Sequence, residues 1–146
     1  MQPERLAEGV WLLAMPASNA YLWRTGGKLS IVDTGVPGSA RSPRAEATSC
    51  GFLDIPAAAF AVLLPDRRVL FSGDSIASFE SAPILGPFNL MPSDAVSAVR
   101  KQAQLDFEIA GVGHGRPIIG GAKSKVLAMV RSLPSGPDTH WPPRIS

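Results

Sequence analysis

Three side chains with metal-binding chemistry stand at the ends of apolar segments in this chain. Asp33 follows the apolar segment 29–32, Asp74 follows a second one, and His114 stands between two glycines after a third. Carboxylates and imidazoles bind zinc, iron and manganese, and sites are often built where strands end. Each residue alone is as well explained as a turn residue, since Asp side chains bond to nearby backbone in turns. Together they favour a metal site.

Other chemistries match the sequence less well. A phosphate-binding Walker loop needs lysine after its second glycine, and Gly121 stands there after Gly115 and Gly120. The dinucleotide pattern fails because Arg116 takes the place of its third glycine, and no Gly-x-Ser-x-Gly nucleophile motif occurs. The glycine-rich stretch 111–121 precedes a predicted helix, whose N-terminus would favour an anion. Phosphate or small-anion binding therefore stays open as an alternative.

The elements that must position these residues are predicted from apolar patterns and turn signals. Gly26 and Gly27 lie between two apolar stretches and predict a hairpin. A second hairpin is predicted around the turn 65–68. The predicted strands cover residues 10–15, 19–24, 29–32, 57–64, 69–71 and 107–112. Residues 36–56 have the composition of a loop, and residues 73–92, with three prolines, are predicted to form a long irregular connection.

Two helices are predicted in the last third of the chain. Ser93 is a good N-cap for a helix that reaches about Gln104, and apolar residues at helical spacing predict another over 121–133. The order of elements indicates a mixed α/β (α+β) fold, with a largely antiparallel sheet and helices on one face. The tail 134–146, which contains His140, is rich in proline and is predicted to be poorly ordered, with the histidine solvated.

Composition narrows the class of protein. The 146 residues fit one domain, predicted over 1–133, and 45% of them are hydrophobic. The net charge of +2 comes without a basic cluster, so neither nucleic acid nor a membrane surface is an expected partner. The single cysteine, Cys50, excludes a disulfide within the chain and a cysteine-based zinc site. The N-terminus has no apolar signal-like segment, which makes a cytoplasmic location the expectation.

Three segments resemble the metallo-β-lactamase superfamily, in its general metal-dependent hydrolase branch. They are SNAYLWRTGGKLSIVDTG (18–35), PDRRVLFSGDS (65–75) and LDFEIAGVGHGRPIIGGA (105–122), in the family's order and over about a third of the chain. The resemblance implies an αββα sandwich. It also implies that Asp74 is the metal-bridging aspartate, His114 the last metal-binding histidine, and Asp33 a turn residue that supports the site.

The family's main motif, His-x-His-x-Asp-His, is absent. Residues 36–64 contain no histidine, and Glu46 and Asp54 are their only acidic residues. The chain thus resembles a truncated family member with a large internal deletion. A zinc site usually has three or four protein ligands, and only Asp74 and His114 match here. We expect zinc, iron or manganese to be bound weakly or not at all, and catalysis to be impaired.

Three functions remain open at this stage. The chain could be a hydrolase completed by ligands from a partner, a non-catalytic binding or interaction remnant of that fold, or a protein that binds phosphate or another small anion. The deletion is expected to expose apolar surface and to favour a homo-oligomer. Relatives act on lactams, thioesters, lactones and phosphoesters, and the residues that choose the small-molecule substrate lie largely in the missing segment.

Overall fold

The computed structural model describes residues 3–32, 61–87 and 92–133. The chain divides into two compact units, Met1–Pro56 and Ala57–Ser146, and each is described by itself. Several predictions concern positions outside the described residues: Asp33, Cys50, His140, the acidic residues Glu46 and Asp54, residues 57–60 of a predicted strand, and the tail 134–146.

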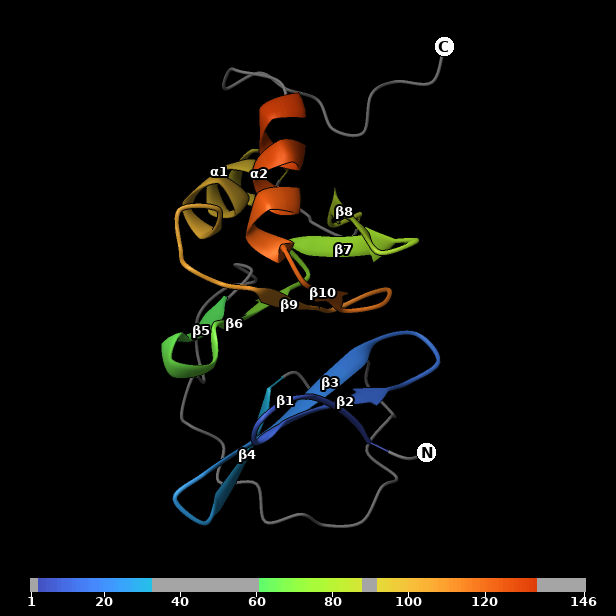
Figure 1. The fold of residues 1–146 in the computed structure, drawn as a ribbon. Coiled ribbons are helices and arrows are strands. Elements are labelled where there is room, and N and C mark those ends of the chain that lie inside the picture. The colour runs from blue at the N-terminus through green and yellow to red at the C-terminus, as the bar shows by residue number, and fades with distance from the viewer. Residues whose placement is uncertain (1–2, 33–60, 88–91, 134–146) are drawn as a thin grey trace. The chain divides into compact units, whose positions relative to one another are not determined.

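The first unit contains one antiparallel sheet of four strands in the order β1-β2-β3-β4 (Figure 1). The strands are β1 (Glu4–Ala7), β2 (Val10–Ala14), β3 (Asn19–Thr25) and β4 (Lys28–Val32). The last three confirm the predicted strands. β1 was not predicted, because an edge strand of four residues with an irregular register carries almost no alternation in its sequence.

The hairpin between β3 and β4 follows directly from its two glycines. Gly26 and Gly27 have φ of +54° and +77°, and Thr25 pairs with Lys28 across them. A two-residue loop with positive φ at both positions matches the twist of the flanking strands. The predicted hairpin is therefore confirmed, together with the register that it sets for β4.

Alternation gives the sheet of the first unit two different faces. Val10, Leu12 and Tyr21 share one face and are 4% exposed or less. Trp11 and Leu22, a cross-strand pair on the opposite face, are only partly buried. Within the described residues of this unit, the centre of one face of the sheet is thus buried and apolar, and the opposite face is partly exposed.

The second unit is built on a four-stranded sheet in the order β10-β9-β6-β5. Its strands are β5 (Val62–Leu64), β6 (Val69–Gly73), β9 (Ile109–Val112) and β10 (Ile118–Ile119). β6 and β9 run parallel, and the other two pairs are antiparallel. The predicted hairpin is confirmed: a short 3₁₀ turn, Pro65–Arg67, joins β5 to β6, and Arg68 closes it with φ of +52°.

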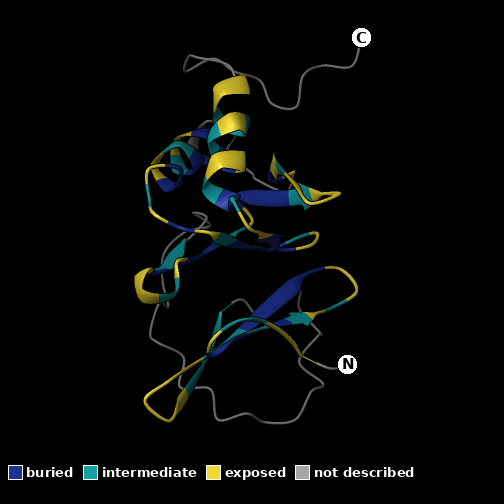
Figure 2. Ribbon diagram, in the orientation of Figure 1, coloured by how far each residue is buried: buried dark blue, intermediate teal, exposed yellow. Residues whose placement is uncertain are grey.

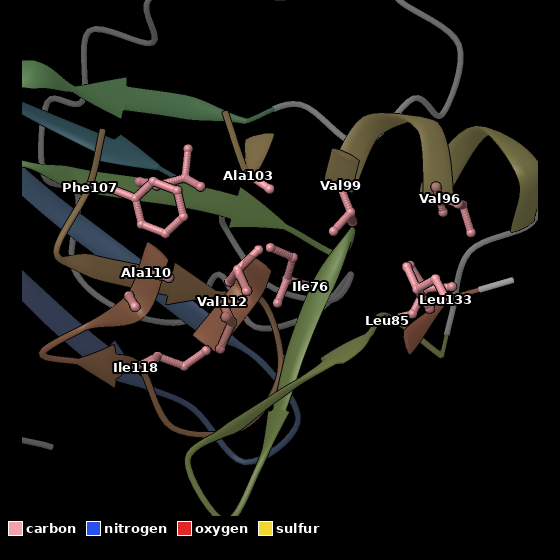
Figure 3. Packing of buried hydrophobic residues seen from close by; sticks show 14 residues of the cluster. Ile76, Leu85, Val96, Val99, Ala103, Phe107, Ala110, Val112, Ile118 and Leu133 are labelled. Atoms are coloured by element: carbon pink, nitrogen blue, oxygen red, sulfur yellow. The ribbon is translucent and has the colours of Figure 1, made fainter. Parts of the chain in front are cut away.

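Two helices, α1 (Pro92–Gln102) and α2 (Ala122–Ser132), lie on the same side of this sheet (Figure 1). Their inner faces join the sheet in one hydrophobic cluster, and α2 turns its exposed residues away from it (Figure 2). Phe107, Val99 and Val112 are completely buried in this cluster (Figure 3). Full burial of such a side chain stabilises a fold by about 1.5–3 kcal/mol, so this cluster is the main source of stability in the second unit.

The prediction of an irregular connection over 73–92 was wrong. This stretch contains the antiparallel hairpin of β7 (Ile76–Phe79) and β8 (Ala82–Leu85). Pro83 pairs with Ser78, whose N–H points away from β8 to the carbonyl of His114, so the proline interrupts no hydrogen bond between the strands. The turn also contains no glycine: its two positions with positive φ are Glu80, at +50°, and Ser81, at +65°. A proline within a strand and a turn without glycine are not typical of a hairpin, so the sequence did not predict it.

The fold is mixed α+β and consists mostly of sheet, with two helices among the described residues. Both helices were predicted, but the start of the first was placed too late. α1 begins at Pro92, so Ser93 lies inside the helix and is not its N-cap. Proline fits the first helical position because it has no N–H, and an N–H at that position would have no partner within the helix. Neither described helix is long and apolar enough to cross a membrane.

Candidate metal site

The parallel pairing of β6 and β9 brings Asp74 and His114 together. Both strands end at the same edge of the sheet, and Gly73 pairs with Val112 at their carboxyl ends. The Oδ1 atom of Asp74 lies 3.3 Å from the Nε2 atom of His114. Parallel strands need a long connection, and here the β7–β8 hairpin and α1 supply it. Two residues forty positions apart in the sequence therefore share one site.

Asp74 projects from a tight turn that is held from within the unit. Gly73 adopts φ of +55°, and Ser75 closes the turn by donating its backbone N–H to the carbonyl of Ser72 at 3.3 Å. The hydroxyl of Ser75 bonds to the same carbonyl at 2.7 Å. The register of β6 against β9 also shifts between Phe71 and Gly73, which makes Ser72 an extra residue on β6. Such a bulge redirects the side chains that follow it.

His114 is held by its backbone against β7. Its carbonyl oxygen accepts the N–H of Ser78 at 3.0 Å, and the Ser78 hydroxyl donates to the carbonyl of Arg116. A Cβ added to Gly115 would collide with the Ser78 backbone, so glycine is required for this close approach. The loop that carries His114 is thus tied to the hairpin that follows Asp74.

The two side chains remain accessible to solvent. The His114 side chain is 24% exposed and the Asp74 side chain 53%. This exposure leaves room for a ligand or water molecules beside the pair. The described residues contain no group of three or more His, Cys, Asp or Glu side chains that could hold a metal ion. Of the three predicted metal ligands, the structure therefore brings two together, while Asp33 lies outside the described residues.

The proposed anion site at the start of α2 is already occupied by a carboxylate of the chain. Gly121 donates its N–H to Oε1 of Glu108, and Ala122 donates to the Glu108 carbonyl at 3.3 Å. Two of the N–H groups at this helix end are therefore already hydrogen-bonded within the chain. A negative side chain there would also repel an anion. Glu108 would therefore compete with an anion for the Gly121 N–H.

The charged groups at the other ends of β6 and β9 form a surface cluster. Arg68 donates to both carboxylate oxygens of Asp106, at 3.2 and 3.0 Å, and lies 3.9 Å from the carboxylate of Glu108. The hydrogen bond with Arg68 holds the pKa of Asp106 below its usual value and raises the pKa of Arg68. All three side chains are about half exposed or more, so this cluster is a set of surface ion pairs near the N-terminal ends of the two strands.

Sequence reasoning missed two residues that shape the site. Gly113 makes room for the Asp74 carboxylate, and Gln102 bonds to the Ser75 hydroxyl that closes the Asp74 turn. Gln102 carried a visible signal, because it stands three positions after Val99 on the apolar face of the predicted helix. A polar residue on such a face needs a buried partner.

A scan against models of known protein families finds none that matches this chain, and a search of curated proteins finds no match either.

Proposed function

We propose that this chain is a truncated metallo-β-lactamase-like domain in which Asp74 and His114 survive as the ligand pair of a metal site. On this proposal the chain binds zinc, or iron or manganese, weakly, and by itself has little or no hydrolytic activity. The observation that carries the proposal is the 3.3 Å between Asp74 Oδ1 and His114 Nε2, at the carboxyl ends of two adjacent parallel strands.

This separation fits two ligands of one metal ion. Zinc binds carboxylate oxygen and imidazole nitrogen at about 2.0–2.1 Å in tetrahedral geometry, which puts two such ligand atoms about 3.3–3.4 Å apart. The side chains need little movement to bind the same ion. Nε2 faces the carboxylate, as a histidine that binds through this nitrogen requires. The donor set of one carboxylate and one imidazole suits zinc, iron and manganese.

The composition of the site explains why we expect metal binding to be weak. A bound metal of this kind supplies an activated water or hydroxide for hydrolysis, by lowering the pKa of that water to about 7. A stable site usually has three or four protein ligands, so two leave most positions to water. The exposure of Asp74 adds to this weakness, because solvent screens the attraction of the carboxylate for a cation.

The fold supports the same family assignment. Four antiparallel strands at the N-terminus, followed by a mixed sheet with two helices on one side, are elements that a truncated αββα sandwich would contain. We propose this sandwich as the architecture of the chain. Direct measurement of the distances between the two units, for example by electron resonance on spin-labelled pairs, tests it.

Metal titration tests the function. We expect isothermal titration calorimetry to detect weak zinc binding to the wild-type chain and none to Asp74→Ala or His114→Ala. Asp66→Ala, which removes an exposed carboxylate from the turn between β5 and β6, is the matched control and should bind as the wild type does. Tight, stoichiometric zinc would contradict the impaired site. Complete absence of binding would favour a purely non-catalytic interaction module.

A further inference from the structure

Gln102 is a buried polar side chain at the end of α1 that the metal site does not use directly. It is 5% exposed and stands on the inner face of the helix, next to the completely buried Ala103. Its Nε2 atom lies 2.8 Å from the Ser75 hydroxyl, and its Oε1 atom lies 3.2 Å from the same oxygen. Ser75 is itself fully buried, so this pair is a polar contact inside the hydrophobic cluster.

The distances decide the direction of these hydrogen bonds. A serine hydroxyl has one hydrogen to donate and accepts through its lone pairs. The Ser75 hydroxyl is 2.7 Å from the Ser72 carbonyl, which is its shortest contact with an acceptor. It therefore donates to Ser72 and accepts the amide hydrogen of Gln102. The result is a relay that runs from the helix, through the hydroxyl, to the carbonyl at the start of the Asp74 turn.

The relay is one of the contacts that hold the Asp74 turn. The backbone bond that closes the turn is long, at 3.3 Å, so the hydroxyl bond contributes much of the closure. On the far side of the turn, Ser75 also accepts the N–H of Gly86 through its carbonyl at 3.0 Å. Ser75, which directly follows Asp74, thus bonds to Ser72 of β6, to Gln102 of α1 and to Gly86, the residue after β8. Movement of its hydroxyl would move the carboxylate.

We propose that Gln102 is a positioning residue for the metal site: its amide, acting through Ser75, holds the Asp74 carboxylate beside His114. The part that concerns metal affinity rests on the proposed function, and the part that concerns the position of the carboxylate does not. Residues that hydrogen-bond directly to a metal ligand typically change metal affinity by about 10–100-fold when they are removed. Gln102 acts one residue further away, through Ser75, so we expect an effect at the lower end of this range.

Gln102→Met tests the proposal, because methionine has the same length and no amide. Gln104→Met is the matched control, since Gln104 is exposed just beyond the end of α1. We expect Gln102→Met to weaken zinc binding by up to about tenfold and Gln104→Met to leave it unchanged. A second readout needs no metal. The ¹⁵N chemical shift of His114 Nε2 should move in Gln102→Met toward its value in Asp74→Ala, and should stay unchanged in Gln104→Met.

A double variant separates positioning from a merely structural role. Ser75→Ala together with Gln102→Met removes both partners, so no buried polar group is left unpaired and the thermal midpoint should recover toward the wild type. If Gln102 positions the Asp74 carboxylate, zinc affinity and the His114 Nε2 chemical shift should not recover when the thermal midpoint does. Recovery of both, or an unchanged Nε2 shift in Gln102→Met, would overturn the proposal. A wild-type chain that binds no zinc would contradict the proposed function alone, because the Nε2 shift still tests Gln102.

Discussion

The Asp74 carboxylate occupies the space in which a side chain at Gly113 would begin. A Cβ built on Gly113 would overlap Oδ1 of Asp74 and lie 3.1 Å from the Gly73 carbonyl oxygen. The backbone N–H of Gly113 donates to that same carbonyl at 3.0 Å, so the two strand ends are in direct contact. Gly113 does not have a positive φ, so the need for glycine here is one of space and not of backbone conformation.

Gly113→Ala should therefore displace the carboxylate. We expect weaker zinc binding and a loss in the free energy of unfolding below the about 1–3 kcal/mol of an overpacked core, because the exposed Asp74 carboxylate can move aside. Chemical denaturation and calorimetry measure the two effects. In an Asp74→Ala background the same change should destabilise the chain less, because the overlapping oxygen is gone. An equal loss in both backgrounds would mean that the Gly73 carbonyl is the decisive neighbour.

Phosphate should not stabilise the wild-type chain through the start of α2. Glu108 already accepts the Gly121 N–H there. We expect the thermal midpoint in phosphate to match that in chloride at equal ionic strength. Glu108→Ala should lower the stability by about 1 kcal/mol, the usual net contribution of one intramolecular hydrogen bond. A phosphate-dependent rise in the wild-type midpoint that survives His114→Ala would revive the anion-binding alternative.

Two phenylalanines offer a matched test of the hydrophobic cluster. Phe107 is completely buried, whereas Phe79 is 68% exposed near the β7–β8 turn. Phe107→Ala should cost about 3–5 kcal/mol of stability, through lost burial and the cavity that it leaves. Phe79→Ala should change stability by less than about 0.5 kcal/mol. Urea denaturation of both variants measures the difference, and similar costs would show that the cluster is misassigned.

The Arg68–Asp106 pair should contribute to stability in a pH-dependent way. The pKa of Asp106 is lowered in the folded chain by its hydrogen bond with Arg68. The contribution is therefore fully present above the unfolded-state pKa, about 4, and is lost as the pH falls through the lower, folded-state pKa. We expect Asp106→Asn to be slightly less stable than the wild type at pH 7 and to match it in strong acid. Both side chains are exposed, so the effect at pH 7 should be small.

On the proposal that the chain is a truncated metallo-β-lactamase-like domain, we expect uncovered apolar surface to favour self-association. The partly exposed face of the first sheet carries the cross-strand pair Trp11 and Leu22, and Arg24 lies 5.7 Å from the Trp11 ring. Multi-angle light scattering should show a mass above that of one chain, and Leu22→Lys should shift it toward the monomer. A monomeric wild-type chain at high concentration would contradict this expectation.

Local patterns in the sequence predicted much of the secondary structure. Alternating apolar residues marked β2, β3 and β4, and the spacing of Val126, Met129, Val130 and Leu133 marked α2. These signals are local, because they reflect the period of each element and the turn between neighbours. The β7–β8 hairpin escaped, since its turn has no glycine and its second strand contains Pro83. Only the contacts around these residues make that conformation favourable.

The sequence by itself determined which side chains had the chemistry of a site: Asp74 and His114 could be singled out because each ends an apolar segment. The tertiary structure alone decided that they meet. The parallel pairing of β6 and β9 depends on how α1, the hairpin and both strands pack together, and no local pattern encodes that pairing. The same holds for Gly113, Gln102 and Glu108, whose roles come from neighbours distant in the sequence. Residue type limits what a side chain can do, and packing determines where it can do it.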